Sequence, residues 1–253
     1  MIKRLFDLTT SLALLAVIWP AVIVALVAVW LNDGASPIYW ANRVGKNNRI
    51  FQMAKIRSMK VGADLAGGTS TSGDDKRITQ VGRVIRKFKL DEFLQLWNVC
   101  KSEMHIVGPR PNTPQDVKLY TSLEMKLLTI KPGITDLSSI VFSDEGTILH
   151  GADNPDELYN RIIRPWKSRL GILYIENQSF TLDFQIVVLT FTALLSKKHA
   201  LLGVNRILRR LRASPDLIET CLRLQTPVEA SPPGMCTEYC AQVPEKIANA
   251  RAK

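Results

Sequence analysis

The sequence has few cysteines, and their placement excludes a disulfide framework. Four cysteines occur in 253 residues, and Cys221, Cys236 and Cys240 all lie near the C-terminal end. Domains stabilised by disulfides carry cysteine at higher density, so the count favours a reducing, cytoplasmic setting. Cys236 and Cys240 are half of a zinc-binding pattern, but no His or Cys pair completes it nearby. We therefore expect no structural zinc.

Acidic residues are also in short supply. The chain has 23 Asp and Glu against 33 Lys and Arg, which gives a formal charge of +10 and a pI near 9.6. Residues 41–110 hold fourteen basic and six acidic residues, so most of the excess is concentrated there. Such a stretch indicates an anionic partner, namely nucleic acid, lipid headgroups or a phosphorylated substrate. No aromatic RNA-stacking pattern or zinc finger is present, and we expect no nucleic-acid partner.

Internal repeats are absent as well, and 253 residues lie at the upper end of the length that one domain occupies. We expect one main domain with appendages. The predicted boundaries are a membrane segment at 1–36, the main domain at 37–211 and a largely disordered tail at 212–253. The tail prediction rests on five scattered prolines and little hydrophobic periodicity.

Charge is missing from the whole of Leu12–Leu31, twenty consecutive residues that are all apolar or proline. That length is enough to cross a bilayer. A secretory signal peptide has a similar pattern, but this run is long and no small-residue cleavage site follows it. Pro20, preceded by Trp19, removes a helical hydrogen bond and allows a bend. Because kinked crossing helices are also common, the residues leave a re-entrant hairpin and a full crossing open.

Basic residues flank the apolar run on both sides, at Lys3 and Arg4 before it and at Arg43 and Lys46 after it. Placing both flanks on the cytoplasmic side satisfies the positive-inside tendency. We therefore predict a re-entrant helix that enters and leaves by the same face.

Hydrophobic periodicity predicts an α+β fold that is mostly helical, with interfacial amphipathic helices. A strand pair is expected over Ile38–Met59, an exposed loop over 62–76, a helix over Thr79–Lys89, a second helix from Asp91 towards Cys100, and a loop or lid over 144–153. Leu182–Leu195 is too short for a confident span and predicts a core or interfacial helix. The cations that follow it are typical of a strip on anionic lipid, or equally of a solvated helix.

The densest group of candidate chemical residues lies at 83–99, where four cations precede the adjacent carboxylates Asp91 and Glu92. At a helix start these carboxylates have a structural interpretation as a cap and a first-turn acid. The sequence around them supports a functional interpretation. In IVGPRP at 106–111, two prolines fix the backbone around Arg110, and a fixed guanidinium suits bidentate phosphate binding. Further candidate phosphate ligands are Lys55, Arg57, Arg77, Arg86 and Lys131.

Taken together, these motifs resemble the bacterial sugar transferase family, the monotopic phosphoglycosyl transferases. The resemblance covers about residues 3 to 195. It rests on KRLFD at 3–7, the proline-broken apolar run, AKIRSM at 54–59, RITQVGRVIRKFKLDEFLQLWNV at 77–99, IVGPRP, KPGIT at 131–135 and YIENQSFTLDFQIVVLT at 174–190. The combination in this order is specific, unlike any of these short strings alone.

The resemblance implies a catalytic domain at 37–211 that transfers a sugar 1-phosphate from a UDP-sugar to undecaprenyl phosphate. Asp91 is implied as the nucleophile that carries the covalent sugar phosphate, and Glu92, with Asp91, as a ligand of Mg²⁺. Adjacent side chains on a regular helix diverge by roughly 100°, so sharing a metal requires an irregular helix start. The implied setting is the cytoplasmic face of the bacterial inner membrane, in contact with membrane lipids. A homo-oligomer, the sugar and the glycan pathway stay open.

The sequence departs from the family pattern at several positions. Trp19 stands where the family usually has Ser, which removes a hydroxyl that bonds to the bent backbone. Asp136 replaces a usual Gly and Gly171 a usual Asp, and 143–166 is longer than in compact members. Two alternatives remain open: a membrane-tethered basic binding protein without catalysis, and a transferase that uses Asp91 and Glu92 only as metal ligands.

Overall fold

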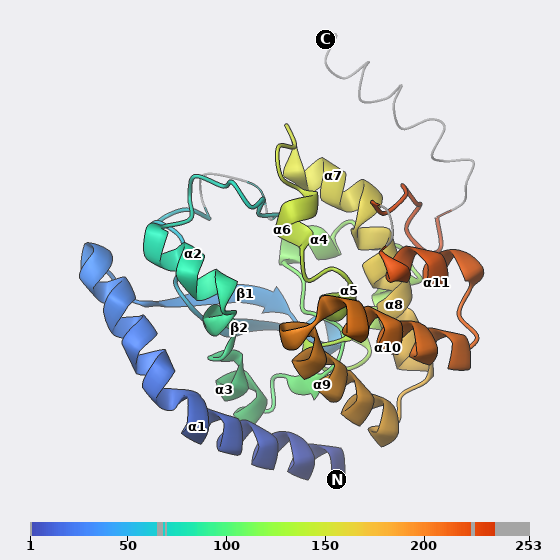
Figure 1. Ribbon diagram of the computed structural model, residues 1–253, viewed down its shortest axis with the longest axis horizontal. Helices are drawn as coiled ribbons and strands as arrows, with labels where there is room; N and C mark the ends of the chain where they lie inside the picture. Colours follow the sequence, from blue (N-terminus) through green and yellow to red (C-terminus); the bar gives the residue numbers. More distant parts are fainter. Residues whose placement is uncertain (1, 65–67, 69, 224–225, 236–253) are drawn as a thin grey trace.

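The computed structural model of the protein describes residues 2–64, 68, 70–223 and 226–235. It is α+β and mostly helical, as the periodicity predicted (Figure 1). The strands are β1 (Ile38–Val44), β2 (Ile50–Ile56), β3 (His105–Val107) and β4 (Gly133–Thr135). The α-helices are α1 (Ile2–Asp33), α2 (Gln80–Lys87), α3 (Gln95–Cys100), α4 (Pro114–Val117), α5 (Leu137–Val141), α6 (Glu145–Ile148), α7 (Pro155–Ile162), α8 (Arg164–Glu176), α9 (Phe180–Leu195), α10 (Lys197–Arg210) and α11 (Pro215–Leu222). Short 3₁₀ turns are η1 (Lys46–Asn48), η2 (Leu90–Glu92) and η3 (Glu124–Leu128).

The predicted strand pair is confirmed as the antiparallel hairpin β1–β2, closed by a turn in which Gly45 N donates to Arg49 O at 2.8 Å. Each face of the hairpin contributes buried residues to a hydrophobic cluster. Ala41 and Met53 belong to the main hydrophobic core, whereas Ala54 and Ile56 belong to a smaller cluster under α1. The hairpin therefore lies between α1 and the rest of the domain.

The predicted helix over Thr79–Lys89 is confirmed as α2, which begins where the Thr79 hydroxyl accepts from Gly82 N at 2.9 Å. The predicted start of the next helix at Asp91 is wrong. Lys89 adopts a left-handed conformation with φ of 53°, which breaks the helical path. The chain then makes the 3₁₀ turn η2 and resumes as α3 only at Gln95.

The apolar run forms one continuous helix, α1, which passes through Pro20 and curves along one side of the molecule (Figure 1). Both of its ends are bound to the same domain. At the N-terminal end Lys3 Nζ donates to Asp183 Oδ2 at 2.6 Å, and Arg4 Nη2 donates to Cys100 O at 2.8 Å. At the other end Asp33 pairs with Arg57 at 2.6 Å. A helix held at both ends in this way lies along the domain and does not project from it.

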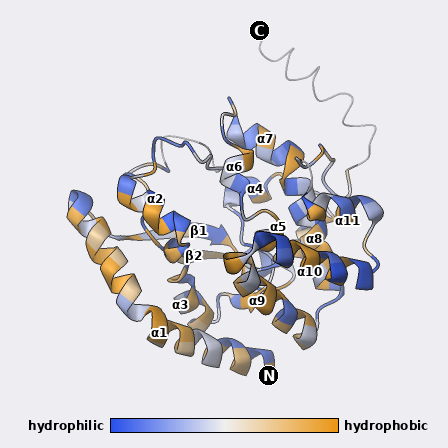
Figure 2. Ribbon diagram, viewed as in Figure 1, coloured by the Kyte–Doolittle hydropathy of each residue, from blue (hydrophilic) through white to orange (hydrophobic). Residues whose placement is uncertain are grey.

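The outer face of α1 is apolar and exposed, as the colouring in Figure 2 shows. Helix α9 continues this face, because the rings of Phe6 and Phe180 meet edge to face at 5.3 Å. The inner face of α9 buries Leu182 and Ile186, so the segment is both a core helix and a surface helix. The exposed large apolar side chains are Ile2, Leu5, Leu12, Val17, Trp19, Ile23, Val24, Val27, Trp30 and Leu31 on α1, and Phe180, Phe184, Val188, Phe191, Leu194 and Leu195 on α9.

The prediction of a disordered tail from residue 212 is wrong for the part of the tail that the structure describes. Pro215 occupies the first turn of α11, where proline is compatible with a helix, and Cys221 is fully buried. The segment 226–235 then lies against α8, where Trp166 Nε1 donates to Val228 O at 2.8 Å. Residues 236–253, with the last two cysteines, lie outside the described residues.

Candidate active site

Two cations project from one face of the β1–β2 hairpin. Lys55 is opposite Tyr39 and Arg43 is opposite Phe51 in the strand register, so alternation places both basic side chains on the same face. Burial lowers the pKa of Lys55 to about 8, with Arg110 and Arg43 also lowering it and Glu92 and Asp91 opposing them. Burial and the same Arg110 also lower the pKa of Arg43. The hairpin thus supplies two cations whose positive charge is not fully balanced by nearby carboxylates.

A third cation comes from α2, which is packed tightly onto the end of β2. A Cβ on Gly82 would lie 1.9 Å from Ser58 O, so only glycine permits this approach. The contact brings Arg86 over the strand end, where its Nε donates to Ser58 Oγ at 2.9 Å. Arg86 also lies close enough to Asp91 to favour the carboxylate's charged form.

Asp91 and Glu92 occupy the 3₁₀ turn η2 and differ in their partners. The two oxygens of Glu92 accept from the guanidinium of Arg110, with Arg110 Nη1 to Glu92 Oε2 at 3.3 Å. Asp91 is buried, with only 9% exposed, and accepts no hydrogen bond from any residue that the structure describes. The turn therefore holds one carboxylate in place and leaves the other available.

The electrostatic environment separates the two carboxylates further. Burial raises the pKa of Asp91, and the charge of Glu92 adds to this effect against the opposing Lys55. Burial also acts to raise the pKa of Glu92, but Arg110 and Lys55 outweigh it and hold that pKa at about 2. In return, Glu92 raises the pKa of Arg110. Perturbed groups gathered in this way are typical of functional sites.

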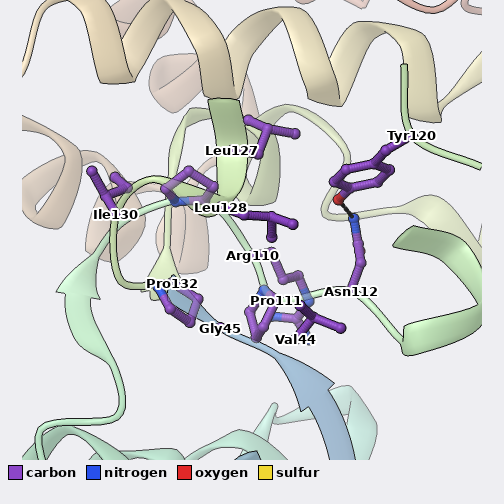
Figure 3. Close-up of a pocket in the computed structure, with 11 residues that line it drawn as sticks. Val44, Gly45, Arg110, Pro111, Asn112, Tyr120, Leu127, Leu128, Ile130 and Pro132 are labelled. Carbon is purple, nitrogen blue, oxygen red and sulfur yellow. Dashed lines mark hydrogen bonds between the residues drawn. The ribbon is translucent and has the colours of Figure 1, made fainter. Parts of the chain in front are cut away.

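Arg110 is positioned by the end of the β3–β4 pair. A Cβ on Gly133 would lie 2.1 Å from Gly108 N, so these two glycines allow the strands to approach closely. Figure 3 shows Arg110 beside Pro111 and Asn112, with Asn112 hydrogen-bonded to the hydroxyl of Tyr120. A small hollow lies beside Arg110, but neither Asp91 nor Glu92 lines it, so it is not the reaction centre.

Three predicted phosphate ligands lie elsewhere. Arg57 is buried and bonded to Asp33, and Arg77 donates to Asp75 and to Ala63 O. The charged groups that shift the pKa of Lys131 are Arg4, Lys46 and Asp7, and neither Asp91 nor Glu92 is among them. The structure therefore brings together Lys55, Arg86, Asp91, Glu92 and Arg110, and leaves Arg57, Arg77 and Lys131 outside.

Sequence reasoning missed Arg43 as a site residue, although the alternation of β1 opposite Lys55 was a signal for it. It also missed a second polar cluster near Arg110, formed by Glu145, Tyr159 and Lys167. These three residues are separated along the chain by up to 22 positions, and no sequence spacing connects them.

The donor set suits Mg²⁺ only if a substrate supplies further ligands. No group of three or more His, Cys, Asp or Glu side chains suitable for a metal occurs in the part of the chain that the structure describes. Mg²⁺ commonly binds one or two carboxylates together with phosphates and water. Each oxygen of Glu92 retains a free lone pair beside the bond to Arg110, and Asp91 is unbonded, so the two carboxylates fit such a site.

The family model described as "Bacterial sugar transferase" matches residues 1–197. The chain belongs to the bacterial sugar transferase family. This sugar transferase is 35% identical over 204 residues to the galactosyl transferase CpsE of Streptococcus agalactiae, covering 76% of this chain and 42% of that protein. It is 34% identical over 205 residues to an undecaprenyl-phosphate glucose phosphotransferase of Komagataeibacter xylinus, covering 78% and 36%.

A further relative is the uncharacterized sugar transferase EpsL of Bacillus subtilis, 33% identical over 189 residues, with 75% of this chain and 85% of EpsL covered. This sugar transferase therefore spans less than half of the first two relatives but most of EpsL. The family match ends at residue 197, the first residue of α10, so the rest of α10, α11 and the segment 226–235 lie beyond it.

Proposed function

We propose that this protein transfers a sugar 1-phosphate from a UDP-sugar to undecaprenyl phosphate through a covalent intermediate on Asp91, and so initiates exopolysaccharide, O-antigen or glycoprotein glycan assembly. The relative from Komagataeibacter xylinus is named an undecaprenyl-phosphate glucose phosphotransferase. The observation that carries the covalent step is the contrast in η2. Glu92 is bound by Arg110, whereas Asp91 is buried beside cations without a hydrogen bond.

In the first step, an oxygen of the Asp91 carboxylate attacks the phosphorus that bears the sugar. A bond forms between this oxygen and phosphorus, and the bond from phosphorus to the bridging oxygen of UMP breaks. UMP leaves with the electron pair, and Asp91 holds an acyl sugar phosphate. A carboxylate nucleophile divides one difficult transfer into two easier ones. A desolvated carboxylate without donors has lost the hydrogen bonds that would weaken its attack.

Four cations supply the charge that this step requires. Lys55, Arg86 and Arg110 surround the two carboxylates, and Arg43 lies near Lys55 and Arg110, which leaves an excess of positive charge for the diphosphate. Preorganised cations at the position where charge develops give the largest single contribution in many enzymes. Arg110 is fixed by Glu92 and by its flanking prolines, so it meets the phosphate without reorganisation.

A Mg²⁺ ion held by Glu92, with Asp91 beside it, would offset the phosphate charge and stabilise departing UMP. Glu92 serves two purposes in this scheme, because it also orients the guanidinium of Arg110. The carboxylates lie on the 3₁₀ turn η2, and the charge of Glu92 acts on Asp91, which supports two side chains close enough to serve one ion.

In the second step, a phosphate oxygen of undecaprenyl phosphate attacks the phosphorus on Asp91. A phosphorus–oxygen bond forms to the lipid, the bond to Asp91 breaks, and the carboxylate is regenerated. The acceptor stays in the bilayer, so its phosphate has to meet Asp91 at the membrane surface. The exposed apolar faces of α1 and α9 support such a position.

The topology we propose is a re-entrant anchor at the cytoplasmic face of the bacterial inner membrane. A straight helix of 32 residues would extend about 48 Å, which is more than the hydrocarbon thickness of a bilayer. The bonds at Lys3, Arg4 and Asp33 instead keep both ends of α1 on one domain. Only 17% of an 18-residue apolar stretch of α1 is buried in the protein, which leaves most of this stretch for lipid.

UMP release tests the proposal. Purified protein in detergent is incubated with a panel of UDP-sugars, Mg²⁺ and undecaprenyl phosphate, and UMP is measured for the wild type, Asp91→Asn and Glu229→Gln. Glu229 pairs with Arg161 at the surface, so Glu229→Gln is a control that removes a carboxylate outside the site. We expect release from the wild type and Glu229→Gln, and loss in Asp91→Asn. Full activity in Asp91→Asn, or no adduct mass on Asp91 when the lipid is omitted, would overturn the covalent step.

A further inference from the structure

A second polar cluster lies beyond Arg110 and has no role in the phosphate chemistry described above. Glu145 begins α6, Tyr159 belongs to α7 and Lys167 to α8. Lys167 Nζ donates to the Glu145 carboxylate and lies 5.2 Å from the centroid of the Tyr159 ring. One carboxylate, one ammonium and one phenol thus meet from three separate helices.

The cluster is crowded by protein but reachable by solvent. The side chains of Glu145 and Lys167 are 30% and 17% exposed. Burial raises the pKa of the Tyr159 phenol, and the Glu145 charge raises that of Lys167 despite its own burial. With raised pKa values, Tyr159 and Lys167 both keep their protons at neutral pH. They offer hydrogen-bond donors and acceptors to a ligand that enters from outside.

Arg110 connects this cluster to the reaction centre. The charge of Glu92 has the largest effect on the pKa of Arg110, and the charge of Glu145 raises it as well. Arg110 in turn affects the titration of Tyr159 and of Lys167. The guanidinium therefore contacts the carboxylate turn η2 through Glu92 and lies within electrostatic range of the second cluster.

The loop before α2 extends over the same side of the molecule. Gly73 N donates to Gly146 O at 2.8 Å, and Ser70 N donates to Asp156 Oδ1 at 2.6 Å. This loop therefore crosses from the hairpin to α6 and α7 (Figure 1). These two bonds join α6 and α7, which carry Glu145 and Tyr159, to the segment that leads into α2 and Arg86.

The chemistry of the cluster selects the uncharged part of a nucleotide sugar. A carboxylate such as Glu145 repels phosphate, so the diphosphate is placed at the cations around Asp91. The phosphorus attacked by Asp91 carries the hexose directly, so the hexose has to lie adjacent to Arg110. Carboxylate, ammonium and phenol groups are suited to bonding its hydroxyls.

The start of α6 is held in place by one residue at the end of the family match and one beyond it. Asp144, next to Glu145, pairs with Lys197 at 2.6 Å and with Arg223 at 3.1 Å. Arg223 directly follows α11, and its guanidinium lies 5.5 Å from the ring of Phe142. The C-terminal helices therefore fix the backbone that presents Glu145, and a fixed group discriminates between ligands better than a mobile one.

We propose that Glu145, Lys167 and Tyr159 form the subsite for the hexose of the donor and determine which sugar this transferase accepts. This inference rests on the proposed function for the donor class. A site built to hydrogen-bond a hydroxyl rejects donors whose hydroxyl is missing or inverted, because its own polar groups are then left without partners.

Binding is measured by calorimetry in the Asp91→Asn background, which separates recognition from turnover. The ligands are UMP, UDP-glucose, UDP-galactose, UDP-N-acetylglucosamine and UDP-N-acetylgalactosamine. The variants added are Glu145→Gln, Tyr159→Phe and the control Glu229→Gln, and circular dichroism confirms that each is folded. Glu145→Gln retains a carbonyl that accepts from Lys167, and Tyr159→Phe carries the test if Glu145→Gln does not fold.

We expect Glu145→Gln to weaken the preferred UDP-sugar roughly tenfold and to alter the order of the four sugars, with the Kd of UMP changed less than about twofold. Glu229→Gln leaves all five constants unchanged. Equal weakening of UMP and of every UDP-sugar would assign the cluster to the nucleotide and overturn the inference. The proposed function fails separately, if the wild type binds UDP-sugars in this manner but releases no UMP.

Discussion

Lys55 makes the activity of this sugar transferase sensitive to alkaline pH. Burial and the nearby Arg110 and Arg43 lower its pKa from 10.5 to about 8 in the free site. A bound diphosphate places negative charge beside the ammonium group, and opposite charge favours the charged form. Binding of the donor therefore raises the pKa of Lys55. Affinity for the donor falls as the pH rises through about 8.

The size of the effect follows from these two values. If the diphosphate restores the ordinary pKa of 10.5, kcat/KM falls ~10-fold per pH unit above 8 and by ~300-fold in total. The pH dependence of kcat/KM reports groups of the free enzyme, so the midpoint should lie near 8. The same pKa shift has the opposite effect on the stability of the folded protein, which increases as the pH rises. Below pH 8 the charged Lys55 destabilises the folded state, and this cost disappears between pH 8 and 10.5.

Rates of UMP release between pH 6.5 and 10 at varied UDP-sugar concentration measure this profile. Lys55→Arg is the matched variant, because a guanidinium stays protonated throughout. We expect the alkaline midpoint in the wild type and its absence in Lys55→Arg. A flat wild-type profile, or the same midpoint in Lys55→Arg, would refute the assignment to Lys55.

Three further predictions concern stability and binding. Asp91→Asn removes a buried charge whose pKa is raised, so its thermal midpoint should rise by a few degrees while UMP release is lost; a lower midpoint would contradict this. Arg110→Lys loses the two-point contact with Glu92, and kcat/KM should fall at least ~10-fold; unchanged kinetics would show that the fork geometry is dispensable. Arg57→Gln breaks the bond to Asp33, so we expect a lower thermal midpoint with an unchanged KM for the donor; a large rise in KM would return Arg57 to the phosphate site.

Local patterns predicted much of the fold. The strand pair follows from β-branched and aromatic residues around a turn signal, α2 from helical periodicity and α9 from an apolar run. The start of the helix after α2 was wrong because Lys89 adopts a left-handed conformation that its residue type does not announce. The ordered part of the tail was also missed, because Cys221 is buried only through contacts with distant helices.

The candidate site shows the same division. The motifs around Asp91 and Arg110 placed the main groups correctly in one cluster, since the chain brings them together over short distances along β3 and η2. Arg57 has the same residue type and nearly the same position as Lys55, but the chain turns after Ile56 and directs it to Asp33. Such a choice depends on a partner 24 positions away, which spacing alone does not indicate.

The two ends of α1 are held by one domain, and this has a mechanical consequence. A crossing helix responds to a thicker or thinner bilayer by tilting, because its length has to match the hydrocarbon. With Lys3 and Asp33 both fastened to the domain, α1 has no freedom to tilt alone. The depth of α1 in a membrane would therefore be set by the position of the whole domain. In the proposed re-entrant arrangement, the height of Asp91 above the lipid would therefore stay constant when acyl chain length changes.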